Sequence, residues 1–137
     1  MKKQAGIWID GSKAVIVHLD NGREWVEEIV AEVENRVHHF EEGNPGVFSG
    51  SRHLRPEKKF EERKQHELDH YLDDVIQHVT SADELYVFGP AETRLHLQHR
   101  MSSDKAFGDM AARLIAVEKA DYLTHNQIVS QVRRFFS

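Results

Sequence analysis

The chain has 137 residues, of which 39% are hydrophobic and 30% charged, a composition typical of a folded globular protein with a substantial core. Its formal net charge of −5 argues against wholesale, non-specific nucleic-acid binding, so any RNA contact has to be local. No cysteine is present, which excludes disulfide and thiolate chemistry, and no apolar run suits a signal peptide or a membrane span. We therefore expect a cytoplasmic protein that forms one domain over residues 1–137.

The first part of the chain predicts an antiparallel meander. Residues 6–9 and 14–19 are apolar, β-branched runs, and the turn Asp20-Asn-Gly22 that follows them is a strong hairpin signal. Residues 25–37 alternate between apolar and acidic positions from Glu28 onward, which indicates a third strand, although their Glu and Ala content also permits a helix.

The middle of the chain predicts a loop and then a helix. Residues 38–56 lack periodicity and are rich in Gly, Ser and Pro, so we expect a long mobile loop there. Pro56 suits the first turn of a helix that runs to about Thr80. An apolar stripe at helical spacing supports that helix: Phe60, Leu68, Leu72, Val75, Ile76 and Val79.

The last part of the chain alternates strands and helices. Residues 84–88 predict a buried strand, and residues 92–101 a helix with Leu97 and Met101 facing inward. Residues 102–112 are a loop or a short helical turn, and residues 114–118 predict a fifth strand. Thr124 opens a capping box, so the closing helix begins there. Its expected buried face is Ile128, Val129, Val132, Phe135 and Phe136.

The predicted element order is β-β-β-α-β-α-β-α. An antiparallel meander followed by two right-handed crossover units gives a five-stranded mixed sheet with packed helices. The strand order 3-2-1-4-5, which is that of the ribonuclease H-like motif, satisfies these rules. The fold class is therefore α/β.

Three motifs carry a resemblance to a known family. They are the strand Gly6 to Asp10 (Gly-Ile-Trp-Ile-Asp), the junction Val87 to Pro90 (Val-Phe-Gly-Pro), and the segment Lys119 to Thr124 (Lys-Ala-Asp-Tyr-Leu-Thr). In order and spacing they resemble the middle domain of archaeal and eukaryotic peptide-chain release factors and of Pelota proteins. The chain is especially similar to the short bacterial relatives of the type "protein required for attachment to host cells".

The resemblance implies a translation-related role. Release factors carry a Gly-Gly-Gln tripeptide between the third strand and the long helix, but residues 38–55 hold no Gly-Gly pair and no glutamine. No catalytic residue carries over, and the resemblance implies a non-enzymatic module without a cofactor. Its expected partners are the ribosome or tRNA, reached through residues 38–56 and the start of the long helix.

Basic residues gather at that helix start, where Lys and Arg can contact phosphate groups. Glu57, Glu61 and Glu62 are interleaved with them, so an ordinary solvated helix face is the alternative. The candidate RNA- or partner-binding residues are Arg52, His53, Arg55, Lys58, Lys59, Arg63 and Lys64.

A hydrolase is an open alternative, either through peptidyl-tRNA hydrolysis by a diverged loop or as a metal-dependent nuclease or peptidase, for which two further motifs are candidates. His66-Glu-Leu-Asp-His70 places two imidazoles on one helix face, where they could bind zinc as in a peptidase. We favour adventitious metal binding by this pair over a zinc peptidase. Asp10 stands where ribonuclease H-type nucleases hold magnesium, but we interpret it as a turn residue that bonds nearby backbone N–H groups. A protein-interaction or stress module without a nucleic-acid role is the third hypothesis. The Phe135-Phe136 pair either packs on the sheet or offers a surface for homo-oligomerisation.

Overall fold

The computed structural model describes residues 2–31, 56–103 and 108–137, without the side chains of residues 56–61. Its centre is a five-stranded sheet in the order β3-β2-β1-β4-β5. The first three strands pair antiparallel, whereas β4 pairs parallel with β1 and β5 pairs parallel with β4. The α/β class and strand order predicted from the sequence are confirmed. The strands are β1 (Lys3–Ile9), β2 (Lys13–Asp20), β3 (Arg23–Val30), β4 (Glu84–Gly89) and β5 (Leu114–Lys119).

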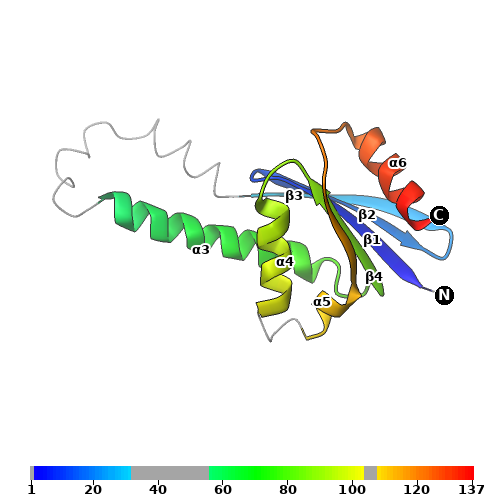
Figure 1. Ribbon diagram of the computed structural model, residues 1–137, viewed down its shortest axis with the longest axis horizontal. Helices are drawn as coiled ribbons and strands as arrows, with labels where there is room; N and C mark the ends of the chain where they lie inside the picture. The colour runs from blue at the N-terminus through cyan, green and yellow to red at the C-terminus, as the bar shows by residue number, and fades with distance from the viewer. Residues whose placement is uncertain (1, 32–55, 104–107) are drawn as a thin grey trace.

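Helices cover both faces of the sheet (Figure 1). One face packs against α3, α4 and α5 over a core that includes Ile7, Ile16 and Val87. The opposite face packs against α6 through a second cluster around Trp8 and Tyr86. None of the helices in the described part of the chain is long and apolar enough to cross a membrane. The helices are α3 (Pro56–Gln77), α4 (Thr93–Ser103), α5 (Met110–Arg113) and α6 (His125–Phe136).

The turns form where the sequence predicts them. Asn21 and Gly22 adopt positive φ angles of 53° and 85°, the backbone that a two-residue hairpin between β2 and β3 requires. The Asp10 carboxylate closes the β1–β2 turn, because its Oδ1 accepts from the Ser12 N–H at 2.8 Å, the Ser12 hydroxyl at 3.0 Å and the Lys13 N–H at 2.9 Å. The interpretation of Asp10 as a turn residue is thereby confirmed.

Glycines allow the sheet its closest contacts. A Cβ atom on Gly89 would lie 2.1 Å from the Ile9 carbonyl oxygen, so only glycine lets β4 end beside β1. A Cβ atom on Gly6 would lie 2.3 Å from a methyl carbon of Val132, so this glycine lets α6 approach β1. Close packing thus explains why glycine occurs in two of the three motifs that carry the family resemblance.

Element ends differ modestly from the sequence prediction. The third strand ends at Val30 rather than near residue 37. Residues 32–55, which include almost all of the loop predicted for residues 38–56, lie outside the described residues. Helix α3 ends at Gln77 rather than Thr80, because the chain turns there to enter β4 through bonds such as Ala82 N–H to the Val79 carbonyl. The predicted capping box at Thr124 is present.

Candidate functional site

Helix α3 is the longest described element, and only part of it packs on the sheet. Its C-terminal half buries Tyr71, Leu72, Val75 and Ile76 against the core, whereas residues 62–66 are exposed. Figure 1 shows the N-terminal half of α3 extending well beyond the edge of the sheet. The sequence explains this division. In the part of α3 that precedes Leu68, most residues are charged or polar, and Phe60 is the exception that continues the apolar stripe. We call residues 62–66 the exposed half of α3, and they are available for contact with another molecule.

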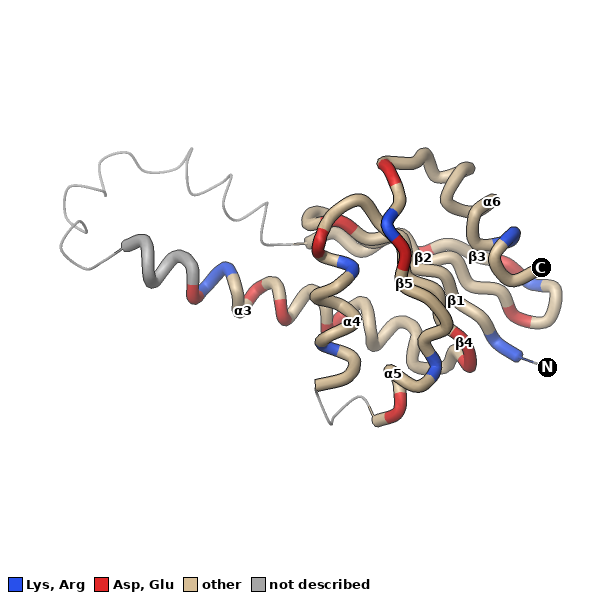
Figure 2. Tube along the Cα trace, in the orientation of Figure 1, with Lys and Arg blue, Asp and Glu red and all other residues tan. Residues whose placement is uncertain are grey.

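Two cations stand on this exposed half. Arg63 and Lys64 are exposed, and neither forms an ion pair with any residue that the structure describes. By contrast, Arg113 pairs with Asp109, and Arg133 pairs with its carboxylate partner in β3. Figure 2 shows the short positive segment on the part of α3 that leaves the sheet. These two charges are therefore free to meet phosphate.

The acidic residues farther along α3 are partly neutralised from α4. Arg100 donates to both carboxylate oxygens of Asp73, at 2.7 and 3.0 Å, and its Nη1 lies 3.9 Å from Asp69. This bidentate geometry is the strongest that an arginine and a carboxylate can adopt. The positive charge of Arg100 therefore reduces the electrostatic repulsion between these carboxylates and an anionic ligand bound at the exposed half.

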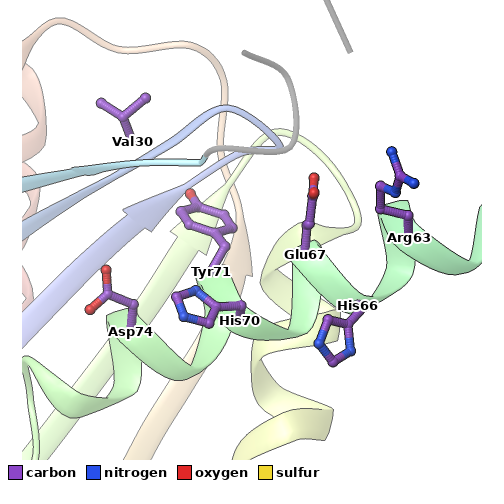
Figure 3. Close-up of a pocket in the computed structure, with 7 residues that line it drawn as sticks. All are labelled: Val30, Arg63, His66, Glu67, His70, Tyr71 and Asp74. Carbon is purple, nitrogen blue, oxygen red and sulfur yellow. The ribbon is translucent and has the colours of Figure 1, made fainter. Parts of the chain in front are cut away.

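A cavity of about 380 Å³ lies beside the same helix, where α3 passes the end of β3 (Figure 3). The Tyr71 hydroxyl, next to this cavity, donates to the Asp10 carbonyl oxygen at 3.1 Å and so joins α3 to the carboxyl end of β1. Ligands of α/β sheets commonly bind near the carboxyl ends of parallel strands. The lining mixes cationic, acidic and imidazole side chains: Val30, Arg63, His66, Glu67, His70, Tyr71 and Asp74.

The candidate binding residues divide into three groups. Arg52, His53 and Arg55 lie outside the described residues. Lys58 and Lys59 belong to α3, but their side chains are not among those described, while Arg63 and Lys64 are exposed as required for binding. Sequence reasoning missed the cavity, because it depends on where α3 crosses the end of β3, and no local pattern encodes that crossing.

The two histidines of the His-Glu-Leu-Asp-His motif both line the cavity and are both exposed. A pair at i and i+4 could supply two nitrogen ligands to a transition metal. Among the residues that the structure describes, no group of three or more His, Asp or Glu side chains is arranged to hold a metal ion. Asp10, the other metal candidate, has one carboxylate oxygen engaged by three donors.

Comparison with solved structures finds a distant structural likeness. No protein-family model matches the chain, and no curated protein does. Among solved structures it is similar to the archaeal translation termination factor aRF1, with a TM-score of 0.47 and 12% sequence identity. The match covers 98% of this chain but only 39% of the termination factor, so this chain spans less than half the length of that protein.

Proposed function

We propose that this chain is a non-enzymatic module that binds structured RNA, in the ribosome or in tRNA, through the exposed half of α3. The observation that carries the proposal is the pair Arg63 and Lys64, exposed and without ion-pair partners in the described structure, on a helix segment that leaves the sheet. The family resemblance in the sequence points to the same class of partner.

The charge distribution fits a local rather than a general nucleic-acid surface. The net charge of −5 repels a polyanion from the molecule as a whole, so binding has to rely on a few cations that approach phosphates directly. In the sequence, Arg52, Arg55, Lys58 and Lys59 precede the described pair and would extend the same positive stretch. Each phosphate contact releases condensed counterions, which makes such binding strongly dependent on salt.

The proposal assigns docking to this surface, and no bond-breaking step. Two polar groups near the cavity have structural roles: the Tyr71 hydroxyl donates to a backbone carbonyl, and the Asp10 carboxylate caps a turn. The mixed lining of the cavity suits polar contacts with RNA beside the phosphate contacts of Arg63 and Lys64.

The test is RNA binding by fluorescence anisotropy, with labelled tRNA and with purified ribosomes, over a series of salt concentrations. The double variant Arg63→Gln/Lys64→Gln is compared with Lys119→Gln/Arg134→Gln, which removes two exposed charges elsewhere. We expect the first variant alone to weaken binding and to reduce the slope of log Kd against log salt concentration by about 1.4 to 1.8. Equal weakening by both variants, or by neither, would refute the assignment of this surface.

A further inference from the structure

Strand β3 forms one outer edge of the sheet, and it pairs with β2 alone among the described strands. Just past its end, the Ala31 N–H donates to the Ser12 carbonyl oxygen at 2.8 Å, so the polar backbone groups of Ala31 point toward β2. These directions alternate along an antiparallel strand, so every second residue of β3 points its N–H and C=O away from the sheet. The residues with outward backbone groups are Glu24, Val26, Glu28 and Val30.

The same edge exposes apolar side chains. Six large hydrophobic residues are exposed in the described part of the chain, and three of them lie on β3. They are Trp25, Val26 and Val30, with 41%, 39% and 54% of their surface exposed. An added strand buries exposed apolar side chains and bonds to outward backbone groups together, so β3 has both features that such a strand uses.

The opposite edge strand, β5, is a poorer site for an added strand. Its pairing with β4 shifts register after Leu85, and the shift leaves Ile115 without an opposite residue in β4. A bulge of this kind bends and twists an edge, which discourages further pairing. The pairing of β3 with β2, by contrast, runs unbroken through eight residue pairs. Of the two edges, β3 is therefore the one that a further strand can extend.

The side chains of β3 place one carboxylate on each face of the sheet. Glu27 shares a face with the buried Ile29, and its two oxygens lie 2.6 Å from His18 Nε2 and 3.7 Å from His78 Nε2. Glu28 points to the other face, where its Oε2 lies 3.0 Å from an imidazole nitrogen of α6. Both carboxylates are partly exposed, so a strand laid along this edge meets negative charge on both faces.

The order of side chains along β3 selects the kind of strand that fits. From Trp25 to Val30 it reads apolar-apolar-acidic-acidic-apolar-apolar. Opposite residues of neighbouring strands lie on the same face and interact, so the complementary strand reads apolar-apolar-basic-basic-apolar-apolar, in either direction. A second copy of this chain fits poorly, because two-fold antiparallel pairing centred on the acids places Glu27 or Glu28 opposite itself.

We propose that β3 is a docking edge for an extended segment of a partner protein, which has two adjacent basic residues flanked by apolar pairs and adds a strand to the sheet. Hydrogen bonds to the outward backbone groups of β3 hold the segment. Its two cations meet Glu27 and Glu28 and so select basic segments over acidic ones. This surface is a protein contact, and it does not depend on the RNA contact proposed for α3.

The test is fluorescence anisotropy with labelled peptides that carry the core Val-Val-Lys-Lys-Val-Val or Val-Val-Glu-Glu-Val-Val between Gly-Ser flanks. We expect the wild-type protein to bind the lysine peptide roughly tenfold more tightly than the glutamate peptide. Val26→Pro removes an outward N–H that β2 does not use, so it should abolish binding. The matched control Val26→Thr keeps this N–H and should bind as the wild type does.

A second variant makes the test independent of how well the edge tolerates proline. Glu28→Lys should weaken binding of the lysine peptide severalfold and strengthen binding of the glutamate peptide. Circular dichroism confirms that each variant is folded.

Four outcomes would overturn the proposal. They are no binding of the lysine peptide at millimolar concentration, equal affinity for both peptides, wild-type binding by a folded Val26→Pro variant, and unchanged peptide preference in Glu28→Lys. Sedimentation velocity adds a fifth, because a wild-type dimer that Val26→Pro dissociates would assign this edge to a second copy of the chain. These experiments contain no RNA, so their failure would leave the proposed function of α3 standing.

Discussion

Replacing Gly89 by alanine tests the closest strand contact in the sheet. The added Cβ would meet the Ile9 carbonyl oxygen at 2.1 Å, and the obstacle is backbone in a buried strand rather than a flexible side-chain end. Overpacking in a dense core costs about 1–3 kcal/mol, and a backbone obstacle belongs at the upper end of that range. We therefore expect the free energy of unfolding to fall by about 3 kcal/mol, which corresponds to a drop in Tm on the order of 10 °C.

The assay is thermal and urea unfolding followed by circular dichroism, with Gly11→Ala as the matched control. A Cβ on Gly11 would lie 3.9 Å from the Thr93 hydroxyl oxygen, an ordinary van der Waals contact, so the same Gly-to-Ala change should be nearly neutral there. If Gly89→Ala were as stable as Gly11→Ala, the close approach of β4 to β1 would be contradicted.

Three smaller predictions concern α6 and its neighbours. Burial raises the pKa of Tyr86 to about 12, so ultraviolet titration should show a late-titrating tyrosine signal that is lost in Tyr86→Phe. The stability that Tyr86 provides below pH 10 is lost as the pH rises toward 12. Thr124→Ala removes the acceptor of the Gln127 N–H and should cost about 1 kcal/mol in urea unfolding, while an unchanged midpoint would contradict the capping role. The hydrogen bond from Arg133 lowers the pKa of Glu24 below its usual range, so a small stabilisation present at neutral pH should vanish on acidification. Glu24→Gln should lack this acid-dependent loss.

The sequence predicted the sheet because its signals are local and mutually consistent. The hairpin at Asn21 and Gly22, the strand that ends at Gly89 and the capping box at Thr124 each depend on neighbours within a few residues. Right-handed crossovers then leave few arrangements of five strands. The exposure of Arg63 and Lys64 is also expected from the sequence, because both lie in the charged segment before Leu68, where the continuous apolar stripe of α3 starts.

What the sequence could not predict depends on pairs of residues far apart in the chain. The cluster of His18, Glu27 and His78 exists because the β2–β3 register and the end point of α3 bring three elements together. The end of β3 at Val30 was also missed, because alternation of apolar and acidic residues continues past it. Such features require the tertiary arrangement and have no short-range signal.

The central claim is that the exposed half of α3 brings this chain to RNA of the translation machinery. Sucrose-gradient sedimentation of cell lysate at low and moderate salt tests it most directly, with the wild-type chain and Arg63→Gln/Lys64→Gln compared. We predict that the wild-type chain moves with ribosomal particles at low salt and leaves them at moderate salt, and that the variant stays at the top of the gradient in both. A wild-type chain that remains at the top at both salt concentrations would contradict the claim.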